Sequence, residues 1–236
     1  MKRAIQITIG FLLVLTVSSC SFKEVIEFRK RLTNTHVESA DFICKEKRVH
    51  FIDMVHIGQE QFYVNVRNEI REFKHKGYVL FYEWIDYNQT DEITLRKTKK
   101  LVGFVPSQKG YSQILSNIKL EGVTVQDNQL FLGLVNGRDF NVDITPEEVI
   151  SAYEKQFGEI QLSSEELESP LDELYEPSQG SENLKSIILD YRTRYLASKI
   201  QESQYDKIIV IYGADHQIGL LEELQSLDQS WRRADP

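Results

Sequence analysis

Three side chains that can bind a metal ion or move a proton follow three apolar segments of the chain. They are His56, Glu83 and His216. The segments before them are rich in β-branched and aromatic residues, as buried strands are, and run over Val49–Val55, Tyr78–Tyr82 and Lys207–Tyr212. Two imidazoles and a carboxylate held together could bind a divalent metal ion. The same groups could equally serve as a general base and a general acid.

The segment between the first two strands has the pattern of a helix. Within Gln59–Lys76, apolar residues recur at spacings of four, four and three, which places on one face Phe62, Val66, Ile70 and Phe73. Gly77 then provides a stop for the helix. Strand, helix and strand in this order make a βαβ unit, whose two strands are expected to be parallel.

A second helix and strand are predicted near the end of the chain. Apolar residues from Leu184 to Tyr195 follow a helical stripe that ends near Gln201, and the strand Lys207–Tyr212 comes next. A Gly-Ala turn and a leucine-rich closing helix follow this strand. We therefore expect an α/β (or α+β) fold with a mixed, largely parallel sheet flanked by helices. If the three strands are parallel neighbours, the three polar side chains emerge at the carboxyl edge, where open α/β sheets bind ligands.

Residues 87–183 form a central insert whose elements are less regular. Leu101–Val105 and Leu130–Val135 are apolar enough to be strands. Thr145 is expected to cap a helix that has proline at its first position. Residues 159–182 are acidic and contain no Lys or Arg, which predicts an exposed loop or a mobile insert.

The chain begins in the way that secreted proteins do. A short basic start is followed by about a dozen apolar residues, which are too few for a comfortable membrane span and typical of a signal peptide. The next residues, Ser18-Ser19-Cys20, resemble the lipobox of bacterial lipoproteins. This resemblance implies that residues 1–19 are removed and that a lipid is attached to Cys20. An uncleaved anchor with an incidental cysteine is the alternative.

Lipid attachment would tether one domain, residues 20–236, to a membrane of the bacterial cell envelope. Ser21 stands where some lipoproteins have the aspartate that keeps them at the inner membrane, so the outer membrane is the favoured location. Residues 21–47 are expected to form an amphipathic segment that leads into the first strand. Cys44 is then the remaining thiol, which cannot form an internal disulfide and is expected to be buried and inert.

The charge of the chain excludes one class of partner. It carries 28 Lys and Arg against 36 Asp and Glu, a formal net charge of −8. Binding to nucleic acid needs a basic face for the phosphates, so we expect no nucleic-acid partner. The sequence gives no indication of the oligomeric state.

The strand ends and the later helix resemble the TraB/TIKI superfamily, which also groups erythromycin-esterase-like and ChaN-like proteins. The similar stretches cover about a third of the chain and read VHFIDMVHIGQEQFY, VLFYEWID, YRTRYLASKI and KIIVIYGADHQIGLLEEL. The family has a GxxH motif after a strand, a strand-end glutamate, a helix arginine and a second GxxH motif. The second motif is intact as Gly213-Ala214-Asp215-His216. The first departs from the pattern, because Asp53 replaces its glycine.

The resemblance implies a metal-dependent peptidase or another hydrolase. It assigns His56 and His216 as metal ligands or acid/base groups and Glu83 as the catalytic carboxylate. It also assigns Arg192, or its neighbour Arg194, to an oxyanion or a substrate carboxylate. Asp53 could be an additional ligand or a sign of altered or lost chemistry.

These observations lead to two functional hypotheses for an envelope lipoprotein. The first is a hydrolase, of the peptidase or esterase class, that uses a divalent metal ion of unknown identity. A metal-free variant would use a histidine as general base. The second is a non-catalytic module that binds a peptide or a small molecule at the same edge of the sheet.

Overall fold

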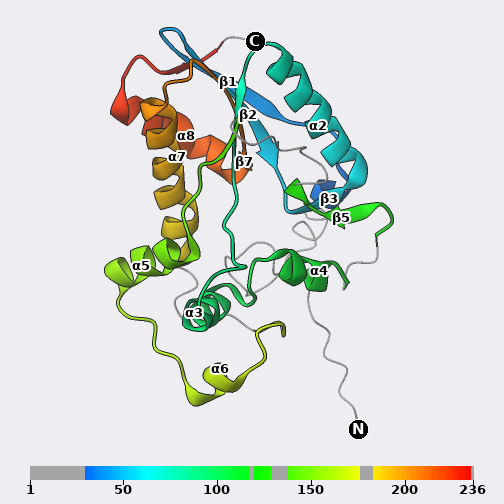
Figure 1. Cartoon of the computed structure of the whole chain (residues 1–236), viewed down its shortest axis with the longest axis vertical. Coiled ribbons are helices and arrows are strands. Elements are labelled where there is room, and N and C mark those ends of the chain that lie inside the picture. Colours follow the sequence, from blue (N-terminus) through cyan, green and yellow to red (C-terminus); the bar gives the residue numbers. More distant parts are fainter. Residues whose placement is uncertain (1–29, 117–119, 129–137, 176–182, 235–236) are drawn as a thin grey trace.

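A mixed sheet of six strands lies at the centre of the computed structural model, which describes residues 30–116, 120–128, 138–175 and 183–234 (Figure 1). The strand order is β6-β4-β7-β2-β1-β8. In chain order the strands of this sheet are β1(Ser39–Cys44), β2(Lys47–Met54), β4(Val79–Tyr82), β6(Asp139–Asn141), β7(Lys207–Gly213) and β8(Arg232–Arg233). A separate two-stranded sheet pairs β3(Ile57–Gln59) with β5(Val123–Val125).

The four strands β6, β4, β7 and β2 are parallel, whereas β1 is antiparallel to both β2 and β8. The predicted fold class, an α/β fold with a largely parallel mixed sheet, is therefore confirmed. The two strands of the predicted βαβ unit, β2 and β4, run parallel as expected. They are not direct neighbours, because β7 from the end of the chain lies between them.

Helices cover both faces of the sheet (Figure 1). One face is covered by α2(Glu60–His75), whose buried residues pack on side chains of β2, β4 and β7. The other face is covered by α7(Arg192–Glu202) and α8(Asp215–Leu227). A π-helical turn, η3(Ser186–Tyr191), leads directly into α7. The predicted helices before β4 and β7 are thus present close to their expected bounds.

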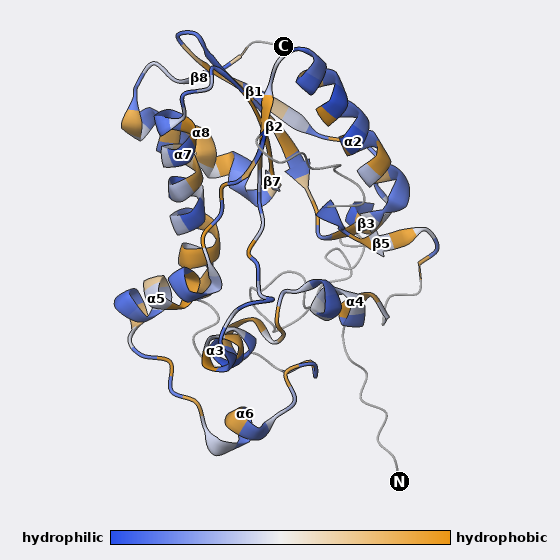
Figure 2. Ribbon diagram, in the orientation of Figure 1, coloured by the Kyte–Doolittle hydropathy of each residue, from blue (hydrophilic) through white to orange (hydrophobic). Residues whose placement is uncertain are grey.

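The burial of β7 explains its continuous apolar sequence. Ile208 through Tyr212 are all buried, because this central strand has helices on both faces. Figure 2 shows hydrophobic residues concentrated in β2 and β7, while α2 and α7 carry hydrophilic residues along much of their length. An amphipathic helix on each face and an apolar strand between them form the core.

The central insert contributes short helices beyond the carboxyl edge of the sheet, in the lower half of Figure 1. They are α3(Glu92–Val102), α4(Gln108–Ser116), α5(Pro146–Phe157) and α6(Ser164–Glu168). The predicted cap of α5 is confirmed, since the Thr145 side chain accepts from the backbone N–H of Glu148 and the Glu148 carboxylate accepts from Thr145 in return.

One expectation about secondary structure is wrong, and one strand was not predicted. Leu101–Val105 is not a strand: its first two residues end α3, and Gly103 closes that helix with a φ of 91°. The amphipathic segment expected before the first strand contains an additional strand, β1, because Ala40, Phe42 and Cys44 alternate into the core.

A further expectation is met in part, and two others concern residues outside the described part of the chain. The acidic stretch 159–182 contains the short helix α6, so it is not a loop throughout. The expected strand Leu130–Val135 lies outside the described residues, as do residues 1–19 and Cys20. Among the described residues, no helix is long and apolar enough to cross a membrane.

Candidate functional site

The three side chains predicted to converge all lie at the carboxyl edge of the parallel strands. β7 pairs in parallel with β2 on one side and with β4 on the other, so the ends of the three strands meet. His56 lies two residues beyond β2, Glu83 directly beyond β4, and His216 in the first turn of α8, which follows β7. The sheet topology therefore provides the common edge that the sequence predicted.

Glu83 belongs to a buried network of charged side chains. Its Oε1 accepts a hydrogen bond of 2.6 Å from Nη2 of Arg192, and its Oε2 accepts from the backbone N–H of Gly213. Arg192 also binds Asp143 with two hydrogen bonds, 2.9 Å from Nε and 2.6 Å from Nη2. The Tyr212 hydroxyl donates to the same carboxylate at 2.8 Å. One arginine thus holds two buried carboxylates, and the network joins β4, β7 and α7 to the insert.

The charges of this network decide the protonation of its members. Burial by itself would raise the pKa of Glu83, but the positive charge of Arg192 and the nearby imidazoles of His56 and His216 outweigh it and lower this pKa. The carboxylates hold the pKa of Arg192 well above its ordinary value in spite of its burial. Glu83 is therefore an anion, and Arg192 a cation, throughout the physiological pH range.

The hydrogen bonds of Thr193 fix the tautomer of His216. The Thr193 hydroxyl donates its only proton to the carbonyl oxygen of Leu189 at 2.7 Å. Its oxygen lies 2.8 Å from Nδ1 of His216, so it must accept there, and the proton of the neutral ring is on Nδ1. The lone pair of the imidazole is then on Nε2. No side chain or backbone group of the described residues forms a hydrogen bond with that nitrogen.

Burial keeps the His216 imidazole neutral. Its side chain lies in the core at the start of α8, with its ring edge-on to that of Tyr212 at a centroid distance of 4.7 Å. Desolvation lowers the pKa of His216 to about 4, although the negative charge of Glu83 acts in the opposite direction. At neutral pH the ring has one free nitrogen lone pair, which can accept a proton or bind a metal ion.

His56 lies at the same edge of the sheet, and its ring contacts the insert. Its ring stacks on that of Tyr111, with centroids 4.7 Å apart and an angle of 26° between the planes. The electrostatic influence of His56 helps to lower the pKa of Glu83. That His56 acts together with Glu83 and His216 stays a prediction.

Arg194 and Asp53 do not join this centre. The Arg194 side chain is 64% exposed, with its Nε 3.4 Å from a carboxylate oxygen of Glu223 on α8. Asp53 accepts a 2.7 Å hydrogen bond from the Gln217 amide. Desolvation, together with nearby carboxylates, raises the pKa of Asp53 to about 6. Asp53 thus links β2 to α8 beside the site.

The donor groups at this edge do not fit a resident metal ion. Both oxygens of Glu83 and both of Asp143 already accept hydrogen bonds from Arg192, Gly213 or Tyr212. The imidazoles of His56 and His216 are two nitrogen ligands, whereas zinc in proteins takes at least three ligands from the chain. In the described part of the chain, no group of three or more His, Cys, Asp or Glu side chains is placed to hold a metal ion.

Two members of the site, Asp143 and Thr193, were not predicted from the sequence. Asp143 lies in the insert, far from Arg192 along the chain, and its only local signal is its place just before a capped helix. Thr193 stands between two arginines in a helix and has no distinguishing pattern. Both become recognisable only when η3 and α7 are packed against the strand ends.

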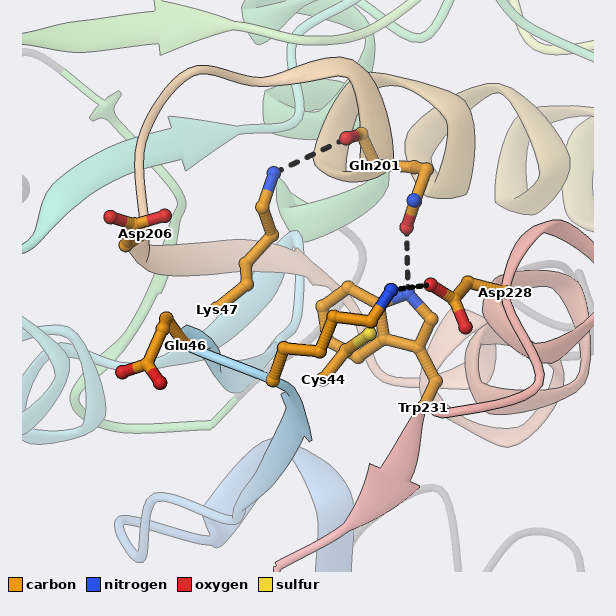
Figure 3. Close-up of a pocket in the computed structure, with 8 residues that line it drawn as sticks. Cys44, Glu46, Lys47, Gln201, Asp206, Asp228 and Trp231 are labelled. Carbon is orange, nitrogen blue, oxygen red and sulfur yellow. Dashed lines mark hydrogen bonds and ion pairs between the residues drawn. The ribbon is translucent and has the colours of Figure 1, made fainter.

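A small cavity lies at the opposite, amino-terminal edge of the parallel strands (Figure 3). Its volume is about 220 Å³, and Cys44, Lys47 and Trp231 are among the residues that line it. Cys44 is buried and is a free thiol, as predicted, and burial raises its pKa. Lys47 donates to three backbone carbonyls at the end of α7, so it stabilises that helix end. This cavity has no group in common with the Glu83 network.

Comparison with known proteins adds no relative to this description. No protein-family model, no curated protein and no solved structure matches the chain. The functional argument therefore rests on the geometry at the strand ends.

Proposed function

We propose that this protein is a cell-envelope hydrolase of the TraB/TIKI type that cleaves a peptide or an ester, with Nε2 of His216 as the general base. The observation that carries the proposal is the bond between Thr193 and Nδ1 of His216. It leaves the lone pair on Nε2, at an edge of the sheet where α/β folds bind ligands. A base needs a fixed tautomer and a free lone pair, and this ring has both.

In the proposed reaction, Nε2 takes a proton from water while the water oxygen bonds to the substrate carbonyl carbon. The bond to the leaving nitrogen or oxygen then breaks, and the leaving group takes the proton back from the imidazolium. Glu83 is a fixed anion near the ring, so it stabilises the imidazolium that forms. Both of its oxygens already accept hydrogen bonds, from Arg192 and from the backbone of Gly213, which favours this electrostatic role over that of a base.

Arg192 takes a positioning role in this proposal. Its Nε and Nη2 atoms bind Asp143 and Glu83, and its Nη1 lies 3.4 Å from the carbonyl oxygen of Ile188. These contacts hold the Glu83 carboxylate in place and leave little of the guanidinium for a substrate. These contacts therefore favour a positioning role for Arg192 over the oxyanion binding that the sequence suggested.

The lipid anchor and the metal ion remain predictions. We propose that Cys20 carries a lipid and that the outer membrane is the partner of the mature chain. In the described part of the chain, no group of three metal-binding side chains is placed to hold a divalent ion, so we derive no step through it. Dialysis against a chelator separates a metal-dependent mechanism from one that uses His216 as the general base. If activity is retained after dialysis and does not change when divalent ions are added, the metal-dependent mechanism is excluded.

The test is a comparison of three proteins on a library of peptides and short acyl esters, with mass spectrometry of the products. We expect the wild type and Arg194→Ala to cleave the same members of the library, since Arg194 is exposed and outside the network. We expect His216→Ala to release no product while its circular dichroism is unchanged. Full turnover by His216→Ala contradicts the proposal. Peptides that co-purify uncut with the wild type favour the binding-module alternative.

A further inference from the structure

Two buried amide side chains lie beside His56 at the carboxyl edge of the sheet. The backbone N–H of Gln126 donates to the carbonyl oxygen of His56 at 2.8 Å, directly after the pairing of β3 with β5. The side chains of Gln126 and Asn128 are on residues that are only 9% and 5% exposed. Two buried amide side chains thus follow β5 directly, where its backbone pairs with that of His56.

The two amides bind each other but leave one polar atom of each without a partner. Nε2 of Gln126 donates to Oδ1 of Asn128 at 2.6 Å. Oε1 of Gln126 and Nδ2 of Asn128 are both buried and have no hydrogen-bond partner. Exchanging the nitrogen and oxygen positions of both amides would still leave one acceptor and one donor free.

Such a pair is unfavourable for the free protein. A buried donor or acceptor without a partner costs about 1–3 kcal/mol, whereas apolar side chains of the same shape would be neutral or stabilising. One free acceptor and one free donor on adjacent side chains are also a specific pattern. The group that complements it has an N–H and a C=O that point in the same direction.

We propose that Gln126 and Asn128 bind a peptide backbone, with a ligand N–H donating to one amide and a ligand C=O accepting from the other. In an extended strand, the N–H and C=O of one residue point to the same side and can both be bound in this way. A simple ester offers only the acceptor. The inference rests on the proposed hydrolytic site and names its substrate class as peptides. Because both free atoms are covered in this structure, binding includes displacement of part of that cover.

The test compares a double variant with a matched control. Gln126→Met with Asn128→Leu removes the pair and keeps its approximate shape. Gln61→Met with Asn65→Leu removes a second Gln–Asn pair, joined at 2.9 Å, that lies exposed on α2. Both pairs of changes are made in His216→Ala, so that ligands are bound but not cleaved. The probes are a library of N-acetylated peptide amides and depsipeptide analogues of the best binder, each with one N–H replaced by oxygen.

We expect calorimetry to show binding about tenfold or more weaker in the Gln126/Asn128 variant and unchanged in the control. The depsipeptide that lacks the N–H bound by the amide pair should bind the parent protein more weakly than the peptide does. In the Gln126/Asn128 variant, this depsipeptide and the peptide should bind with equal affinity. The melting temperature of the variant should be equal to or above that of its parent, because two unpaired groups have been removed. If the double variant does not fold, the single change Asn128→Asp is measured with the same ligands. It replaces the unpaired Nδ2 donor of Asn128 with a carboxylate oxygen, so the ligand C=O should lose its hydrogen bond.

Two results overturn the inference: a library without any binder, or equal affinity of parent and variant for the best binder. Its failure is distinguishable from failure of the proposed hydrolysis. If the wild type cleaves peptides and the Gln126/Asn128 pair has no influence on affinity, the proposed hydrolysis is supported and peptide binding by this pair is excluded. If the pair controls affinity but no peptide is cleaved by the wild type, the protein is a peptide-binding module.

Discussion

At the scale of single residues, the position of one proton determines what His216 can do. The Thr193 hydroxyl has donated its proton to Leu189, so it can only accept from the imidazole. The carboxylate of Glu83 is held by Arg192 and stays ionised near the ring. The residues that interact directly with the imidazole thus specify both its tautomer and the electrostatic field around it.

Replacing Thr193 by valine tests this control of the tautomer. Thr193→Val keeps the shape of the side chain but removes the acceptor at Nδ1. We expect kcat to fall about 10–100-fold with little change in KM, because the proton can then occupy either nitrogen. Nitrogen-15 NMR of the imidazole should show a mixture of tautomers, a readout that a purely structural role would not change. Thr193→Ser retains the hydroxyl and should keep both the activity and the single tautomer.

The lowered pKa of His216 predicts how stability and activity depend on pH. The folded-state pKa is about 4 and the ordinary value is 6.5, so between these values the unfolded chain binds the proton and the folded chain does not. The stabilising contribution is complete above pH 6.5 and is lost as the pH falls toward 4. Between pH 7.5 and 4.5 the wild type should lose about 2–3 kcal/mol more of its free energy of unfolding than His216→Asn.

Urea denaturation of both proteins at several pH values measures this difference. Because Asp53 titrates in the same range in both proteins, its contribution cancels in the comparison. Parallel stability curves for the two proteins would contradict the lowered pKa. In the activity profile, the acidic limb of kcat/KM should lie near pH 4, well below that of an ordinary histidine.

At the scale of elements, the joint between β7 and α8 brings Glu83 and His216 together. Gly213 ends β7, and its N–H donates to Glu83. A Cβ on this residue would lie 3.4 Å from Oε2 of Glu83 and 3.5 Å from Cδ2 of His216. The glycine of this motif therefore leaves room for the two side chains that make up the candidate site.

Graded substitution at Gly213 tests this packing. The Cβ of Gly213→Ala makes ordinary contacts, so we expect less than about 1 kcal/mol of destabilisation and most of the activity to remain. The branched methyl groups of Gly213→Val would enter the space of Glu83 and His216, which should cost about 1–3 kcal/mol and abolish activity. Thermal denaturation and turnover of the two variants measure these effects. Full activity of Gly213→Val would show that the space is not needed.

The sequence predicted elements well where periodicity was strong and local. The stripe of α2 and the apolar run of β7 gave correct elements because each is buried along its whole face or length. The short run Leu101–Val105 could be read as a strand or a helix, and the structure places its start in α3. Asp143 was not predicted because its role depends on a bidentate bond to Arg192, which no local pattern encodes.

At the scale of the whole molecule, the two cysteines have different expected roles. Cys44 is buried at the amino-terminal edge of the sheet. Cys20 is the predicted site of lipid attachment. The anchor and the candidate site therefore depend on separate parts of the chain.

Membrane fractionation separates these roles. We expect Cys20→Ser to move the protein from the membrane fraction to the soluble fraction, because the lipid is lost, while its specific activity is unchanged. Cys44→Ser should stay in the membrane fraction and have a slightly lower melting temperature, since it places a hydroxyl in the core. Retention of Cys20→Ser in the membrane fraction would favour an uncleaved apolar anchor instead.

The place of β7 between β2 and β4 has a consequence for biosynthesis. This strand begins at residue 207 of 236, yet both halves of the parallel sheet depend on it for their pairing. A nascent chain cannot complete this sheet until β7 has been made, since such long-range contacts form late. If the chain is exported, as its first residues predict, it must stay unfolded while it passes through a narrow membrane channel. A central strand that is made so long after β2 would delay folding in the way that such export requires.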